Sequence, residues 1–236
     1  MTKKNNTKLT KLIKYYSLIN YNLFFSKESV NRYKANKFII SGDKDLLLQR
    51  LSSSIKNIKN CELKKNATNQ VFSDGNPNSS IMIVGEGPGS NEDEEGIPFV
   101  GRAGTLLDKM LESINLGRNN IYITNVVNYR PPENRRPTEE EITKYLPYLI
   151  KHIEIINPKI LILLGSTALN TIIGNENVIS DVRGKWYEKN IGKCKTSVIA
   201  TFHPAFLMRQ PSQKKMAWAD LKMIRKKISE LKIKID

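Results

Sequence analysis

Two residue types that often build scaffolds and active sites are scarce in this chain of 236 residues. Cysteine occurs twice, at Cys61 and Cys194. This excludes a disulfide framework and a four-cysteine zinc or iron–sulfur site supplied by this chain alone. Histidine also occurs twice, at His152 and His203, so few assignments of a catalytic histidine are open. We expect both cysteines to be structural thiols.

Long apolar runs are missing as well. No uninterrupted apolar stretch approaches the ~20 residues that span a membrane, although an apolar fraction of 39% is sufficient for a core. The N-terminal segment is basic, but its apolar residues are interrupted by Lys, Asn, Ser and Tyr. It would therefore make a poor signal peptide. We expect a monomeric, cytoplasmic protein with no membrane partner.

Acidic residues are in the minority, and the imbalance is confined to the two ends of the chain. The formal net charge is +15. Residues 1–60 hold 13 Lys and Arg against 3 Asp and Glu, and residues 212–236 hold 8 against 3. The middle is neutral, with 17 of each. Basic ends suit a polyanionic partner such as nucleic acid; the alternative is a compositional bias toward Lys, Asn and Ile.

Four short apolar runs predict buried strands, at residues 81–84, 121–127, 159–165 and 197–202. Helical spacing of apolar residues occurs at 7–25, 44–59, 102–115, 166–173 and in the last 25 residues, and Thr138-Glu-Glu-Glu predicts a capping box that opens a helix to about residue 156. We expect loops at 62–79 and 130–137, and a loop or small hairpin at 174–195. Apolar strands alternating with helices indicate a parallel sheet covered on both faces.

The stretch 80–104 combines a strand, a glycine-rich turn and a cluster of acids. Gly85, Gly87 and Gly89 follow the strand directly. Their spacing is not G-x-G-x-x-G and no Gly-Lys-Ser/Thr follows, which disfavours a nucleotide-binding loop. An ordinary strand-to-helix connection and a catalytic loop both stay open. The acids that this loop brings to the end of the strand are Glu86, Glu92, Asp93, Glu94 and Glu95.

Three of the predicted strands end in residues that suit a binding site. The first ends at Glu86, the second at Asn125 and the fourth at His203. Taken singly, Asn125 can be a turn residue and His203 a loop cap. In a parallel sheet, however, all three ends lie along one edge, where open α/β sheets bind ligands. An amide and an imidazole there can read a small polar heterocycle, with Phe99 stacked on it.

Several longer motifs, in this order, carry a resemblance to a known family. They are Gly85-Glu-Gly-Pro-Gly, Gly96-Ile-Pro-Phe-Val-Gly-Arg-Ala-Gly, Thr124-Asn-Val-Val-Asn-Tyr-Arg-Pro-Pro-Glu-Asn-Arg-Arg-Pro-Thr and His203-Pro-Ala-Phe-Leu-Met-Arg. Over roughly residues 61–211 the chain resembles the family 4 uracil-DNA glycosylases. The resemblance implies a three-layer α/β/α fold with a central four-stranded parallel sheet. We expect a catalytic domain at 61–236, preceded at 1–60 by a basic helical extension that packs on the core.

The resemblance implies an enzyme that hydrolyses the N-glycosidic bond of uracil in DNA to start base excision repair. A non-catalytic binder of damaged DNA or of a partner protein, and a glycosylase for other deaminated bases, are the alternatives. Within the implied site, Gly85 and Gly87 flank Glu86 in the water-positioning motif. Phe99 would stack on the flipped uracil, and Asn125 would read its amide edge.

The remaining implied roles concern the chemistry and the DNA. His203 would lie at the O2 carbonyl of uracil, where a donor stabilises the negative charge left on the base. A carboxylate can orient water, and the choice among Glu86, Glu92 and Asp93 stays open. The residues expected to contact DNA are the wedge residues Leu207, Met208 and Arg209, and the arginines Arg102, Arg130, Arg135 and Arg136.

One departure from the family concerns its [4Fe–4S] cluster, which typical members hold with four cysteines. Cys61 matches one of these positions, whereas Ile58, Tyr129 and Tyr145 stand where we expect the other three. One thiolate cannot hold such a cluster. We therefore expect no cofactor and no metal, and we expect the two tyrosines to pack together in the space that the cluster would fill.

Overall fold

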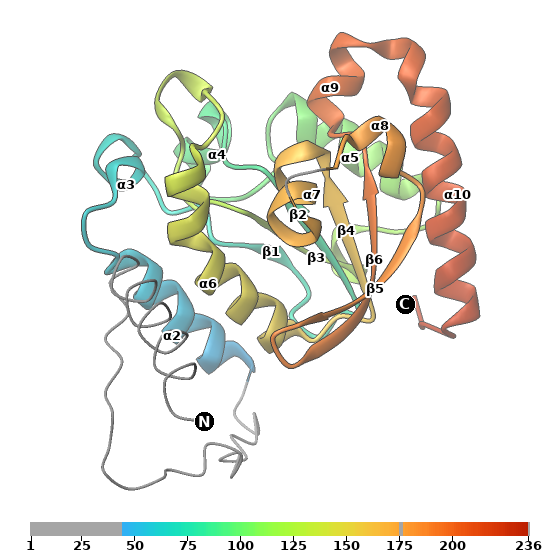
Figure 1. Cartoon of the computed structure of the whole chain (residues 1–236), viewed down its shortest axis with the longest axis horizontal. Coiled ribbons are helices and arrows are strands. Elements are labelled where there is room, and N and C mark those ends of the chain that lie inside the picture. The colour runs from blue at the N-terminus through green and yellow to red at the C-terminus, as the bar shows by residue number, and fades with distance from the viewer. Residues whose placement is uncertain (1–43, 175–176, 236) are drawn as a thin grey trace, which may run out of the picture. The chain divides into compact units, whose positions relative to one another are not determined.

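A six-stranded mixed sheet forms the centre of the computed structural model, which describes residues 44–174 and 177–235 (Figure 1). The strand order is β1-β3-β2-β4-β6-β5. The inner strands β3, β2, β4 and β6 are parallel, as predicted, and antiparallel strands β1 and β5 extend the sheet at its two edges. The bounds are β1 Asp74–Gly75, β2 Ile81–Gly85, β3 Tyr122–Asn125, β4 Ile160–Leu164, β5 Trp186–Ile191 and β6 Cys194–Thr201.

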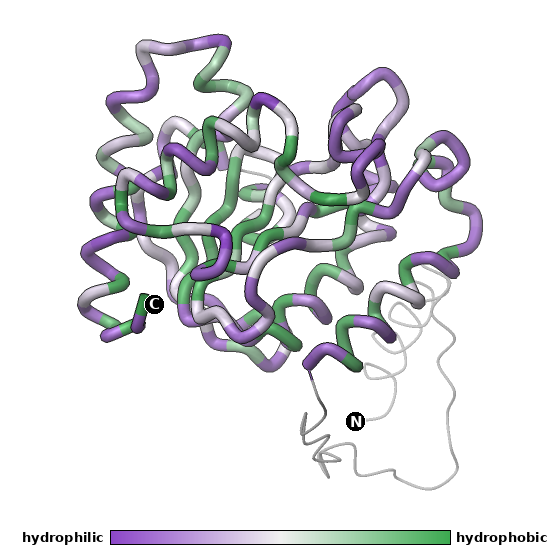
Figure 2. Tube along the Cα trace, turned by 180° about the vertical axis from the view of Figure 1, so that it is seen from behind, coloured by the Kyte–Doolittle hydropathy of each residue, from purple (hydrophilic) through white to green (hydrophobic). Residues whose placement is uncertain are grey.

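The inner strands are apolar on both faces because each face packs against helices. Successive side chains of a strand point to opposite sides of the sheet. In β2, Ile81 and Ile83 accordingly belong to one hydrophobic cluster, and Met82 and Val84 to the other. The apolar runs in the middle of Figure 2 follow these strands. The expected three-layer α/β/α arrangement is confirmed.

Each face of the sheet has its own group of helices. One face is covered by α2 (Lys44–Lys56), α6 (Glu139–Ile156) and α7 (Gly165–Ile173). The other is covered by α5 (Arg102–Glu112), α9 (Pro204–Arg209) and α10 (Lys214–Glu230). In the described part of the chain, no helix combines the length and the apolar character that crossing a membrane requires.

The predicted capping box of α6 is present. Thr138 Oγ1 accepts a hydrogen bond from the Glu141 amide at 3.2 Å, and Glu141 Oε2 accepts one from the Thr138 amide at 2.8 Å. These reciprocal bonds satisfy amides that a helix start leaves free. They also fix where the proline-rich loop before Thr138 meets the helix.

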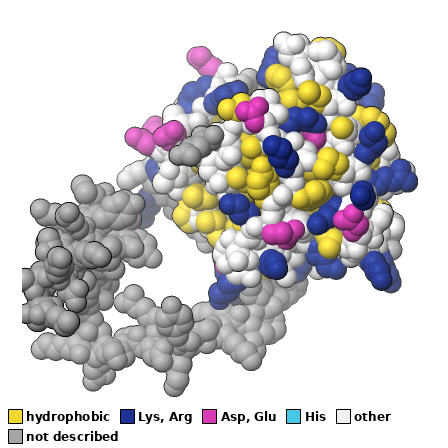
Figure 3. Space-filling view, turned by 45° about the vertical axis from the view of Figure 1, so that its right-hand side comes forward, with side chains coloured by type: hydrophobic (Ala, Val, Ile, Leu, Met, Phe, Trp, Pro, Cys, Tyr) yellow, Lys and Arg dark blue, Asp and Glu magenta, His cyan; other side chains and the backbone are white. Residues whose placement is uncertain are grey.

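The basic C-terminal helix α10 packs one face on the core and exposes the other to solvent. Ile224 and Ile228 are buried, whereas Met216 and Trp218 are exposed. Lys222 Nζ lies 6.0 Å from the centre of the Trp218 ring. Figure 3, turned to bring the α10 side of Figure 1 forward, shows apolar side chains scattered among Lys and Arg on the described part of this face.

α2 contributes Leu48, Leu51 and Ile55 to a core cluster, so the described part of the predicted extension packs on the core. The remainder of that predicted extension, including the helix at 7–25, lies outside the described residues. The structure differs from the expectations in two segments: the expected loop at 62–79 contains α3 (Glu62–Asn66) and β1, and the acidic turn forms the short helix α4 (Ser90–Glu95). The segment 174–195, expected to be a loop or a small hairpin, contains α8 (Ile179–Val182) and β5, and β5 pairs antiparallel with β6 as a hairpin.

Candidate active site

A cavity of about 180 Å³ lies at the carboxyl edge of the parallel sheet. It gathers residues that follow β2, β3 and β6, as the strand-end argument predicted. Its walls include the candidate residues Glu86, Gly87, Glu92, Phe99, Asn125, Arg135 and His203, together with Pro88, Gly89, Ala103, Pro131, Asn134, Pro137 and Ala205.

Asn125 is the last residue of β3, and its side chain is buried in the wall of this cavity. The residue is 3% exposed, and its Oδ1 atom has no hydrogen-bond partner among the described residues. A buried acceptor without a partner is costly in a folded protein. The feature therefore points to a ligand that brings an N–H group to this atom.

Gly85 does not line the cavity, but it leaves room for two side chains that do. It pairs with Asn125 across β2 and β3. A Cβ atom at Gly85 would lie 2.4 Å from Asn125 Oδ1 and 2.6 Å from Phe99 Cζ. Any side chain at Gly85 would therefore displace the amide or the ring, so this position requires glycine.

Phe99 presents its ring beside His203. The two ring centres are 5.6 Å apart, and the planes are tilted by 31°. The Phe99 backbone has φ of +57°, a conformation that bulky residues rarely adopt and that occurs mostly where the surrounding structure enforces it. Gly104 allows this conformation, because a Cβ there would lie 1.7 Å from the Phe99 carbonyl oxygen.

His203 caps the start of α9 and is held as one neutral tautomer. Its Nδ1 atom accepts a hydrogen bond from the Ala205 amide at 3.2 Å. Burial lowers the pKa of His203 to about 4, and the charge of Arg209 contributes in the same direction against an opposing effect of Glu92. A neutral imidazole that accepts at Nδ1 carries its proton on Nε2. His203 is therefore a neutral donor through Nε2.

The acids of this region have different surroundings. Glu86 Oε2 accepts a hydrogen bond from the Thr167 hydroxyl of α7, and Oε1 has no partner within the described ranges. Both oxygens of Glu92, in contrast, bind backbone amides, at Gly89 (3.0 Å) and at Gly101 (2.9 Å). Glu86 thus has a free oxygen at the cavity, whereas Glu92 braces the loops around it.

Asp93 does not take part in the cavity. Its carboxylate is buried and accepts hydrogen bonds from the amides of Thr68 (2.9 Å) and Asn69 (3.1 Å). It therefore ties the segment after α3 to α4. The sequence left Glu86, Glu92 and Asp93 open as the acid that orients water, and the structure corrects this by placing Asp93 outside the cavity. Neighbouring residues of a short helix such as α4 point in different directions.

The arginines expected at DNA surround the cavity to different extents. Arg135 forms a two-point ion pair with Glu141 (2.6 and 2.8 Å), and Arg130 Nε donates to Asn134 Oδ1 at 2.8 Å. Arg102 and Arg136 are exposed. Arg136 lines a neighbouring cavity of about 440 Å³ between α6 and α7, which shares Pro137 with the first.

The expected wedge residues lie in α9 rather than in an extended loop. Leu207 is 1% exposed and packs in the core cluster that contains α5 and α10. Met208 is partly buried and Arg209 is exposed. Leu207 is therefore a core residue in this structure, and Met208 and Arg209 remain the accessible members of the motif.

Sequence reasoning missed Thr167, although a signal was present. β4 ends at Leu164, on the same sheet edge as the other strand ends, and α7 starts immediately after it. The strand-end argument applied to β4 would have placed this hydroxyl near Glu86. The signal is weak because Ser and Thr at a helix start also serve as ordinary caps.

Cys61 lies in a packed hydrophobic cluster with Tyr129 and Tyr145. Its Sγ atom is 3.2 Å from the Tyr145 hydroxyl. Cys61, Tyr129, Tyr145 and Ile58 are buried in the same hydrophobic cluster. Burial raises the pKa of both tyrosines. One thiol does not fit a [4Fe–4S] cluster, and the described residues contain no group of three or more His, Cys, Asp or Glu placed to hold a metal.

Comparison with a family model and with two curated relatives indicates one family. Residues 72–222 match the model of the uracil DNA glycosylase superfamily. The chain is 43% identical over 183 residues to the type-4 uracil-DNA glycosylase of Sulfurisphaera tokodaii, which covers 75% of this chain and 83% of that protein. It is 44% identical over 167 residues to the type-4 uracil-DNA glycosylase of Thermotoga maritima, covering 70% and 85%.

Proposed function

This chain belongs to the type-4 uracil-DNA glycosylases, and from that premise we propose how its cavity binds uracil and cleaves it from DNA. The protein is a DNA glycosylase that hydrolyses the N-glycosidic bond of uracil. The observation that carries the assignment of the cavity is the buried Oδ1 of Asn125 without a partner in the described chain.

Asn125 reads the edge of the base. Uracil presents an N3–H donor beside an O4 acceptor, so the amide accepts from N3–H through Oδ1 and donates to O4 through Nδ2. Cytosine has an acceptor at N3 and a donor at the neighbouring position, so both hydrogen bonds would be lost. Each buried polar group left unpaired costs ~1–3 kcal/mol, which is sufficient for strong discrimination.

Phe99 supports the base after it leaves the helix. A base within a stack cannot reach this cavity, so the uracil nucleotide must be flipped out at a cost of a few kcal/mol. Stacking on an aromatic ring returns ~1–3 kcal/mol per base. Arg102, Arg130 and Arg136 each adjoin in sequence a residue that lines the cavity, so they would contact the phosphates beside it.

His203 stabilises the leaving base. When the C1′–N1 bond breaks, its electron pair stays on uracil and the sugar becomes cationic. A donor that is already oriented toward the developing charge needs no reorganisation during the reaction. The Nε2–H group of neutral His203 fills this role at O2, because Nδ1 is held by the Ala205 amide.

Glu86 orients the water that completes the reaction. Its Oε2 atom is fixed by Thr167, which leaves Oε1 to accept a hydrogen bond from water. The water oxygen forms the new bond to C1′, and its proton leaves through the carboxylate to solvent. The negative charge of Glu86 also favours the cationic sugar. The uracil anion takes up a proton from solvent, and the products are free uracil and an abasic site.

Activity of site variants tests this assignment. Asn125→Ala should lose most cleavage of a uracil-containing oligonucleotide, detected as strand scission after alkali, and Phe99→Ala should lose ~1–3 kcal/mol of stacking. Asn119→Ala, an exposed asparagine of η1 (Arg118–Asn120), is the matched control. Wild-type turnover by both cavity variants would show that uracil binds elsewhere.

We further propose that the protein works as a cytoplasmic monomer without an iron–sulfur cluster. The packing of Tyr129 and Tyr145 around Cys61 supports the absence of the cluster. Protein purified without oxygen should be colourless and contain no stoichiometric iron. A brown preparation with about four irons per chain, the content of one [4Fe–4S] cluster, would overturn the proposal.

A further inference from the structure

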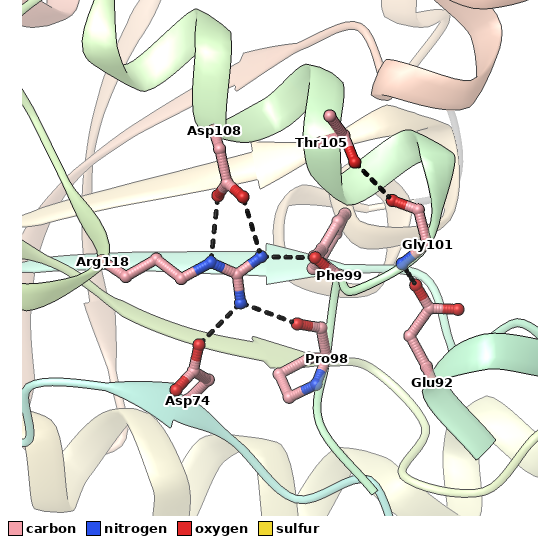
Figure 4. Close-up of polar contacts among 8 residues, drawn as sticks. All are labelled: Asp74, Glu92, Pro98, Phe99, Gly101, Thr105, Asp108 and Arg118. Atoms are coloured by element: carbon pink, nitrogen blue, oxygen red, sulfur yellow. Dashed lines mark hydrogen bonds and ion pairs between the residues drawn. The ribbon is translucent and has the colours of Figure 1, made fainter. Parts of the chain in front are cut away.

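Arg118 forms a network behind the candidate active site, outside the cavity walls (Figure 4). Its Nε donates to Asp108 Oδ1 at 3.0 Å, and its Nη1 donates to Asp74 Oδ2 at 2.6 Å. The same guanidinium reaches two consecutive backbone carbonyls. Nη1 donates to Pro98 O at 3.2 Å, and Nη2 donates to Phe99 O. Four groups from three segments therefore meet on one side chain.

The two carboxylates fix the guanidinium in place. Asp74 lies on β1 and Asp108 on α5, so the side chain is held from two elements. Although burial by itself lowers the pKa of Arg118, the hydrogen bonds and charges of Asp108 and Asp74 raise it above its ordinary value. The cation is permanent, and its planar array of donors cannot be reproduced by lysine.

The carbonyl that Arg118 binds belongs to the residue with the unusual backbone. Phe99 has φ of +57°, and an unfavourable conformation persists only where neighbours over-determine it. Gly104 makes room for the Phe99 carbonyl, but room alone does not select the conformation. Arg118 supplies the attraction by holding Pro98 O and Phe99 O on the side away from the cavity.

We propose that Arg118 is a positioning residue, which sets the orientation of the Phe99 ring from outside the cavity. This inference rests on the proposed stacking role of Phe99. Arg118 touches neither the base nor the reacting atoms. Its loss should let the Pro98–Phe99 peptide rotate, so that the ring no longer lies against Asn125 and His203.

The test uses Arg118→Lys and Arg118→Met in the full chain. A ring displaced by about 1 Å can lower activity on the order of 100-fold, so we expect kcat/KM for uracil-containing DNA to fall roughly 10- to 100-fold. Inhibition by free uracil should weaken in parallel, since the free base depends on the same ring. The salt dependence of DNA binding should not change.

Loss of stability alone would not give this pattern. Leu149→Ala, in the core cluster on the opposite face of the sheet, is the control for a general loss of stability. It should lower the unfolding midpoint without changing the inhibition constant of uracil. If Arg118→Met does not fold, the same measurements are made on Arg118→Lys and Asp74→Asn. Asp74→Asn removes the charge of one of the two carboxylates that bind Arg118 and keeps the shape of the side chain.

A double-mutant cycle with Phe99→Ala separates this inference from the proposed function. If Arg118 acts through the ring, Arg118→Lys should have no further effect on kcat/KM in the Phe99→Ala background. Additive losses, or a folded Arg118→Lys variant with wild-type uracil inhibition, would overturn the inference. Wild-type activity of Phe99→Ala itself would instead refute the stacking role on which it rests.

Discussion

Acidification from pH 7 to pH 5 should destabilise this protein through its two histidines. His152 is fully buried between Phe72, whose ring is stacked at 4.6 Å, and Tyr122, whose hydroxyl lies 2.8 Å from Nε2. Burial lowers the pKa of His152 to about 3 and, with the charge of Arg209 contributing, that of His203 to about 4. Both are therefore neutral in the folded protein at pH 5.

The magnitude follows from proton uptake by the unfolded chain. An unfolded histidine has a pKa of about 6.5, so above this pH both states are neutral and the stability is fully present. As the pH falls below 6.5, the unfolded state binds a proton that the folded state does not, and stability falls until the folded pKa is reached. At pH 5 the loss is ~2 kcal/mol per histidine, or ~4 kcal/mol for the two.

Urea unfolding at pH 7, 6 and 5 measures this loss as a change in the free energy of unfolding. His152→Phe is the matched variant, because phenylalanine keeps the stacking on Phe72 but binds no proton. Its free energy of unfolding should depend on pH about half as steeply between pH 6 and 5. A wild-type stability that is flat from pH 7 to 5, or an unchanged slope in His152→Phe, would refute the reasoning.

The site and the surface give three further predictions. Gly85→Ala should remain folded but lose activity on the order of 100-fold, because its Cβ would displace the Phe99 ring; near-normal cleavage would contradict the close approach of the ring to Gly85. Cys61→Ser should keep full activity in the strand-scission assay, whereas an inactive but folded variant would show that the thiol has a function. Lys215→Gln with Lys226→Gln should reduce the slope of log binding constant against log salt by up to ~0.9 for each phosphate that the variant no longer neutralises; an unchanged slope would show that these two lysines do not contact phosphates.

The inner strands could be predicted because their sequences admit few other structures. Residues 160–164 are a run of five apolar residues, all buried, as expected for a strand covered on both faces. The edge strand β5 lacked this signal, since three of its six residues are polar, and two of these, Glu188 and Asn190, are exposed. It pairs with β6 across a turn at Gly192, whose φ of +56° is a conformation that glycine adopts readily.

Residues of the candidate site could be predicted where the strand topology alone determines their position. They could not be predicted where the position depends on the direction in which a side chain points. Parallel strands bring Glu86, Asn125 and His203 to one edge whatever the details of the loops. Whether Asp93 faces the cavity depends on α4, which was not visible in the pattern. Leu207 has a side chain that suits a wedge and a core equally well, and its packing in the cluster of α5 and α10 decided between them.

Arg118 was not predictable for a related reason. It lies in a short connection between α5 and β3, where an arginine is usually a solvated surface residue. Its partners come from segments up to 44 residues away in sequence. Only the folded arrangement shows that they converge on the backbone of Phe99.

The two outer strands of the sheet bear on self-association. An exposed edge offers unpaired backbone groups to any other strand, and long apolar edges promote aggregation. Here one edge is β1, of only two residues, and the other is β5, which carries Glu188 and Lys189. Neither is a good template for adding a strand from a second molecule. The apolar inner strands are thus separated from any strand of a second molecule by a short edge strand on one side and a charged one on the other.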